Sequence, residues 1–212
     1  MDTNEIKGEA DEIKNQTKDT IDEVKDTIKS TNFKEETKAT TGFVKEILLN
    51  PFEEIRRIAQ EENKVLGKAI VILIALLVLN ILEVVTAHLS IKYTFKSIIT
   101  AVLNPLVFIA VYGVLCFVFA KKDTRKSLLT TISTIIITYV PELFSSLFTI
   151  INNLTSSKLT VVFGVCASVC SLATYLFRFY AVKHLTESEE NEGLRKYLVV
   201  ELITRFVVRL IF

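Results

Sequence analysis

The chain has 212 residues, of which 50% are hydrophobic and 23% are charged, with a formal net charge of +1. A net charge this close to zero does not favour binding to the negatively charged backbone of a nucleic acid, so we expect no nucleic-acid partner. The two kinds of residue are segregated along the chain. Residues 1–66 hold most of the charges and residues 67–212 hold the long apolar runs. This division predicts a polar arm in front of a membrane domain.

Residues 1–46 are predicted to form a charged, helical cytoplasmic arm. The first 40 residues lack an apolar core segment, so we expect no cleavable signal peptide. Apolar or small side chains recur there with an 11-residue period, which is typical of a nearly straight helix face: Ile6, Ala10, Ile13, Thr17, Ile21, Val24 and Ile28. Three interpretations stay open, namely a solvated, partly disordered helix, a weak coiled coil with a partner, and a lipid-binding interfacial helix.

Residues 47–66 are predicted to form an amphipathic helix at the membrane interface. Asn50 is a plausible N-cap, Pro51 suits the first helical position, and Glu53 and Glu54 complement the positive end of the helix dipole. The apolar face comprises Phe52, Ile55, Ile58, Ala59, Val65 and Leu66. Arginines beside this face favour the headgroup layer of a membrane.

Residues 67–212 are predicted to form an all-α bundle of about five transmembrane helices. A bilayer core needs about 20 helical residues to cross, and the expected spans are 67–89, 98–120, 128–152, 159–182 and the shorter 196–212. Pro105 and Pro141 fall inside two of them and predict helix kinks, with neighbouring helices bonding the freed carbonyls. The fifth segment could instead lie in the interface.

Basic residues predict the orientation of the bundle. They are concentrated before the first span, between the second and third, and between the fourth and fifth. Because cytoplasmic loops carry the excess of Lys and Arg, the N-terminus is expected to be cytoplasmic. Arg178, at the cytoplasmic end of the fourth span, is expected to extend to the headgroups. The localisation predicted is an integral membrane protein of a bacterial cell membrane.

Ionisable groups inside the spans are the candidate functional residues, because each is costly in a bilayer without a partner or a function. Counting along the helices brings two acids, two arginines and an amide to one layer. Glu201, Arg205 and Arg209 also form one stripe, spaced i, i+4, i+8. We expect this stripe to pair with acids of other spans, in a network of Glu83, Glu142, Glu201, Arg205, Arg209 and Asn104. The network could hold the fifth helix in place, line an aqueous cavity or ion path, or lie in water if that helix stays on the surface.

Catalytic signals are missing from the sequence. It contains no nucleotide-binding glycine loop, HExxH, CxxC or GxSxG motif, and its loops are short. The cysteines Cys116, Cys166 and Cys170 lie in apolar segments and read as packing residues. His88 and His184 fall at opposite membrane faces. We therefore expect no enzyme activity, no cofactor and no metal site.

One stretch carries a family resemblance. VYGVLCFVFAKKDTRKSLLTTISTIIITYVPELFSSL, residues 111–147, joins a span to a short basic loop and a helix with a proline in its outer half. This resembles the middle of the Yip1-domain membrane proteins, and LLNPFEEIRRI, residues 48–58, resembles the lead-in of bacterial members. The resemblance covers residues 47–212 and implies five spans with a cytoplasmic N-terminus. It implies no specific functional residue.

Two functions remain as hypotheses. Eukaryotic relatives implied by the resemblance act in vesicle traffic and contact prenylated small GTPases, but the Lys/Ile/Thr-rich composition here is closer to bacterial members. The preferred function is a non-enzymatic scaffold or adaptor in the lipid bilayer, with protein partners bound through residues 1–66. The alternative is a small transporter or channel that uses the intramembrane Glu/Arg network.

Overall fold

The computed structural model describes residues 3–30, 32–60, 65–87, 91–155 and 159–212. These residues form nine α-helices, one short 3-10 helix and no strand, in the order α1 (Thr3–Ser30), α2 (Phe33–Leu49), α3 (Pro51–Gln60), α4 (Leu66–Thr86), α5 (Ile91–Phe119), η1 (Lys122–Thr124), α6 (Leu128–Ile137), α7 (Val140–Leu154), α8 (Thr160–Leu185) and α9 (Glu190–Ile211). The predicted all-α membrane bundle is confirmed.

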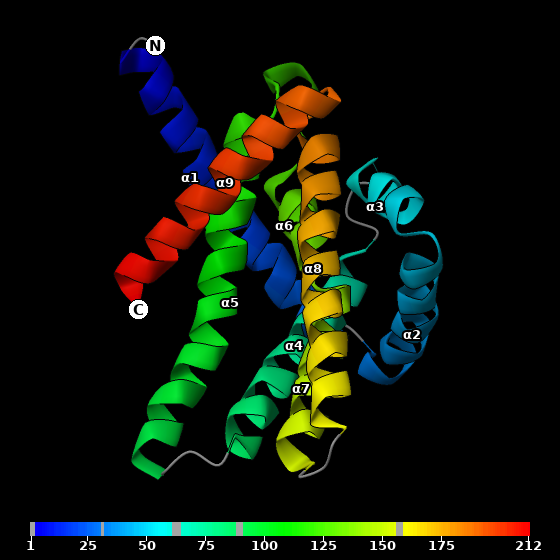
Figure 1. The fold of residues 1–212 in the computed structure, drawn as a ribbon. Helices are drawn as coiled ribbons and strands as arrows, with labels where there is room; N and C mark the ends of the chain where they lie inside the picture. Colours follow the sequence, from blue (N-terminus) through cyan, green and yellow to red (C-terminus); the bar gives the residue numbers. More distant parts are fainter. Residues whose placement is uncertain (1–2, 31, 61–64, 88–90, 156–158) are drawn as a thin grey trace.

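The centre of the bundle is the pair α6 and α7, which other helices surround (Figure 1). Every residue of α6 except Ile132 is buried. α4 and α8 pack on α7, and α5 packs on α6 from the other side. Gly113 permits that approach, since a Cβ added there would lie 2.7 Å from Cγ1 of Ile132. In the orientation of Figure 1, the chain turns at η1 and between α8 and α9 at the upper end of the bundle.

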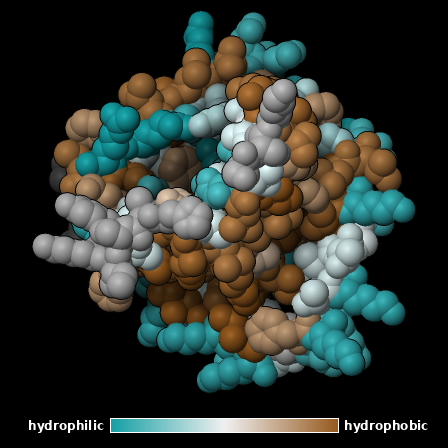
Figure 2. Space-filling view, turned by 60° about the horizontal axis from the view of Figure 1, so that its bottom comes forward, coloured by the Kyte–Doolittle hydropathy of each residue, from teal (hydrophilic) through white to brown (hydrophobic). Residues whose placement is uncertain are grey.

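Four segments are long and apolar enough to cross a membrane: Leu66–Thr86, Thr94–Phe119, Leu128–Leu154 and Thr160–Leu185. They lie where the first four spans are predicted. Apolar side chains dominate the side of the molecule drawn in Figure 2, with hydrophilic ones gathered mostly at its edge. The fifth segment, in α9, runs obliquely across α5 and α8 and is richer in charge (Figure 1). A fifth span therefore stays a prediction.

The two prolines act differently. Pro105 lies inside the continuous helix α5, and the carbonyl of Ala101 that it leaves without its helical donor accepts a hydrogen bond from Nδ2 of Asn80, 3.4 Å away on α4. Pro141 instead follows a break, because α6 ends at Ile137, the residue four positions earlier whose carbonyl a proline ring would meet. The third span is therefore two helices rather than one kinked helix.

The helices before the bundle pack against it. α3 begins at Pro51, where the sequence predicts a helix start, and its apolar residues Ile55, Ile58 and Ala59 are buried, with the helix in contact with α6 and α8. The ring of Phe52 packs on that of Tyr180 of α8, with centroids 4.0 Å apart and the planes tilted by 32°. The face that was expected to contact the membrane is thus used for protein packing. Placement in the headgroup layer stays a prediction.

α1 lies behind the bundle in Figure 1 and contacts α4 and α6. Val24 packs against the small cluster of Leu66, Ile70 and Leu129. Of the apolar stripe predicted for this helix, Ile21 and Ile28 remain 48% and 45% exposed. The side chains of Ile6 and Ala10, and all of His88, lie outside the described residues.

Candidate functional site

A carboxylate shared by two arginines joins α8 to α9. Oε1 of Glu201 lies 2.8 Å from Nε of Arg205, one turn along α9, and 3.5 Å from Nη1 of Arg178 on α8. The side chains of Glu201 and Arg178 are 11% and 8% exposed, whereas that of Arg205 is half exposed. Buried charges persist when an opposite charge lies this close. One carboxylate facing two guanidinium groups leaves the group with a positive excess.

Aromatic rings surround the buried arginine. The guanidinium carbon of Arg178 lies 4.6 Å from the ring centre of Phe108, 4.5 Å from that of Tyr139 and 5.5 Å from that of Tyr175. Tyr175 also accepts a hydrogen bond of 2.6 Å from Nη2 of Arg205. Ring faces stabilise a desolvated cation. The expectation that Arg178 extends to the headgroups is therefore wrong, because the rings and Glu201 hold it inside the bundle.

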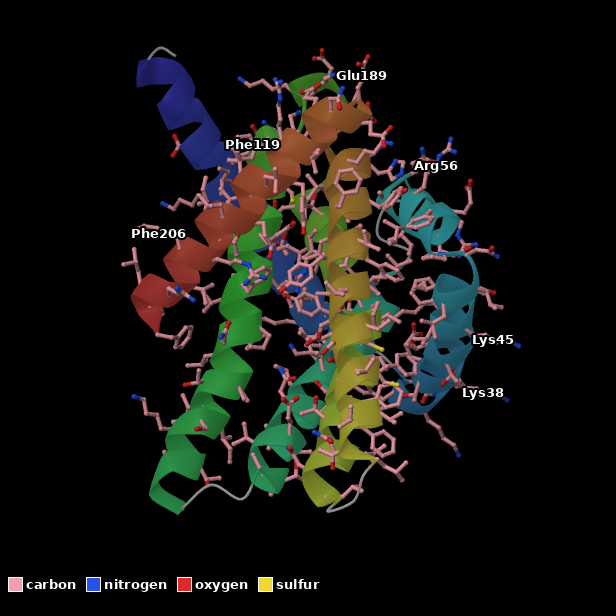
Figure 3. All side chains as sticks on the ribbon, viewed as in Figure 1. Lys38, Lys45, Arg56, Phe119, Glu189 and Phe206 are labelled. Carbon is pink, nitrogen blue, oxygen red and sulfur yellow. The ribbon has the colours of Figure 1, made fainter. Side chains whose placement is uncertain are left out.

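A large cavity opens beside this group. It has a volume of about 1140 Å³ and is lined by residues of α4, α5, α7, α8 and α9. α9 forms one of its walls. In Figure 3, Phe119 marks the upper part of α5 and Phe206 the lower part of α9. Its charged lining comprises Lys96, Glu142, Arg178, Arg205 and Arg209. Four of these five side chains are basic, so the cavity favours negative charge.

A second cavity, of about 630 Å³, lies between α4, α7 and α8. Glu83 lines the second cavity but not the large one, while Glu142, Ser171 and Tyr175 line both cavities. Oε2 of Glu142 accepts a hydrogen bond of 3.3 Å from Thr174. The two cavities therefore meet at a carboxylate anchored between α7 and α8.

The six residues predicted as a network occupy three places. Asn104, Glu142, Arg205 and Arg209 line the large cavity, Glu83 lines the second, and Glu201 lies against α8. Among the described residues, the ion pair of Arg205 is with Glu201 on its own helix, and not with Glu83 or Glu142 as expected. The stripe instead meets the rest of the bundle through Arg178 and Tyr175.

Sequence reasoning missed Arg178 and its rings as members of the site. One signal could have found them: Tyr175 and Arg178 are spaced i, i+3 within an apolar run, so they share a helix face. The rings of Phe108 and Tyr139 carry no such signal. Among the described residues, no group of three His, Cys, Asp or Glu side chains is placed to hold a metal ion.

The four apolar segments and the charged interior define this chain as a multi-pass integral membrane protein. The sequence model of the Yip1 domain matches residues 45–189, which is more than half of the chain, and the protein belongs to the Yip1 domain family. α1 and α9 lie outside the matched residues, so two arginines of the large cavity, Arg205 and Arg209, come from a helix beyond the domain. No curated protein and no solved structure matches the chain.

Proposed function

We propose that the protein is a non-enzymatic membrane scaffold or adaptor that recruits protein partners through α1. One observation carries this proposal: a charged helix of 28 residues is attached to the bundle and keeps most of its charged side chains in solvent. Oε2 of Glu12 lies 3.6 Å from Nη1 of Arg125, and Oε1 of Gln16 accepts a hydrogen bond of 3.1 Å from the backbone N–H of Leu128.

These contacts indicate that α1 is an ordered helix attached to the bundle, with its charged face accessible, and not a free N-terminal tail. A helix that is already ordered loses less conformational entropy when a partner binds. Its exposed acids and lysines provide charge for selecting that partner and for steering its approach. Basic residues before the first span and between the second and third support a cytoplasmic position for this helix under the positive-inside rule. The membrane we propose is a bacterial cell membrane.

The test is capture of partners from native membranes after crosslinking. The full chain is compared with residues 41–212 and with a full-length variant that carries Lys18→Glu and Lys25→Glu, two exposed lysines of α1. Lys38→Glu with Lys45→Glu on α2 is the matched control, since both side chains point away from the bundle (Figure 3). A partner that is held by the full chain and the control, and lost by the other two, supports the proposal. The same captures from all four chains overturn it.

A second function, a small transporter or channel, is favoured by the meeting of the two cavities at Glu142. A carboxylate within the membrane is a frequent part of an ion or proton path. This function predicts that Glu142→Gln abolishes flux of protons or small ions into proteoliposomes, while removal of residues 1–40 leaves the flux unchanged. The scaffold proposal predicts the reverse dependence for partner capture, so the two assays separate the functions.

A further inference from the structure

The large cavity carries more positive charge than its own acids compensate. Glu142 and the neighbouring Glu201 oppose four basic side chains, which leaves a formal excess of two positive charges at neutral pH. Arg205 and Arg178 both pair with the carboxylate of Glu201, so one negative charge faces two positive ones. Positive charge that lies among apolar helices without matching acids is costly. An anion in the cavity would offset that cost.

The donors suit a phosphate group in particular. Three of the four cations are arginines, whose planar fork matches the oxygens of phosphate and can donate two parallel hydrogen bonds. Arg178 is a buried donor that is not fully used: its Nε makes no hydrogen bond within the described part of the chain, although the side chain is only 8% exposed. The guanidinium groups of Arg178 and Arg205 are both held in position by Tyr175 and Glu201.

The apolar part of the cavity indicates what carries the phosphate. Leu76, Val84, Leu202 and Phe206 line it together with the basic side chains. Leu202 and Phe206 are also 72% and 63% exposed. An apolar strip therefore runs from the cavity onto the surface of a helix beside the membrane spans, where the tail of an amphiphile can lie.

We propose that this cavity binds the phosphate-bearing headgroup of an anionic lipid, with Arg178, Arg205 and Arg209 around the phosphate and the tail along Leu202 and Phe206. Free phosphate shares the headgroup chemistry and is the other source of the ligand. The site goes beyond the scaffold function, because it requires neither a protein partner nor α1. It also differs from an ion path, because the ligand is retained.

The test is native mass spectrometry of the full chain purified in detergent. Phosphatidylglycerol and phosphatidylcholine are added in equal amounts, with or without millimolar inorganic phosphate. Arg209→Gln is the informative variant, since Arg209 lines the cavity and belongs to none of the ion pairs described among residues of the bundle. Arg195→Gln is the matched control, an exposed arginine of the same helix outside the cavity.

We expect the unaltered protein to retain one phosphatidylglycerol in preference to phosphatidylcholine, and Arg209→Gln to bind it about tenfold more weakly, the effect of losing one charge-assisted hydrogen bond. Arg195→Gln should bind as the unaltered protein does. Displacement of the lipid by inorganic phosphate assigns the site to the free anion, and no displacement assigns it to the lipid. Equal retention of both lipids, or equal weakening in the two variants, overturns the proposal.

Discussion

Removal of the carboxylate of Glu201 tests whether the charges in the bundle are held as pairs. Glu201→Gln keeps the shape of the side chain and leaves Arg178, 8% exposed, without its ion pair. Breaking a buried pair by removing one partner costs about 3–5 kcal/mol. The lower end applies here, because three aromatic rings still contact Arg178 and because Arg205 is half exposed.

We therefore expect Glu201→Gln to lower the free energy of unfolding by about 3 kcal/mol. For a domain of this size that corresponds to a fall in Tm of about 6–12 °C, measured by thermal unfolding in one fixed detergent. The control is Glu192→Gln on the same helix, where a hydrogen bond from Lys196 lowers the pKa of this exposed acid. The control should lower Tm far less, because an exposed ion pair contributes little to stability.

A second variant makes the same test from the arginine side. Arg178→Met removes the buried cation and fills the space with an apolar chain of similar length, so the double variant with Glu201→Gln should lose less stability than the sum of the two single variants. If Glu201→Gln lowers Tm no more than Glu192→Gln does, the pair contributes nothing measurable. Strict additivity in the double variant would likewise contradict the reasoning.

Two further predictions concern helix contacts. Asn80→Leu removes the donor to the Ala101 carbonyl, and Pro105→Ala restores a helical N–H for that carbonyl. Asn80→Leu should therefore destabilise the Pro105→Ala protein by about 1 kcal/mol less than it destabilises the unaltered protein. Thermal unfolding of all four proteins in this double-mutant cycle measures the difference, and equal costs would refute the prediction. Gly113→Val should destabilise the bundle by about 1–3 kcal/mol through its clash with Ile132, and Ile132→Ala should recover part of that loss in the same assay.

Local patterns explain why much of the fold was predictable. The four candidate spans follow from long apolar runs, and the start of α3 follows from Pro51, because both rules act within one segment of chain. The carbonyl freed by Pro105 could also be foreseen, since a proline removes a donor wherever it stands in a helix. The identity of the replacement donor, Asn80, could not, because α4 and α5 approach each other only in the folded bundle.

The sequence by itself determined the class of the protein, the polar arm, the apolar spans and the stripe of Glu201, Arg205 and Arg209, because helical spacing places residues four apart on one face. Only the tertiary structure decided which residues of other helices contact that stripe. Arg178 lies at the end of an apolar run, where it could extend to water as well as turn inward. The oblique packing of α9 brings Glu201 within 3.5 Å of it. The rings of Phe108 in α5 and of Tyr139, the N-cap residue of α7, cover its faces. The inward position prevails because partners from α9, α5 and the junction of α6 with α7 stabilise the cation together. No local pattern in the chain predicts that these partners meet.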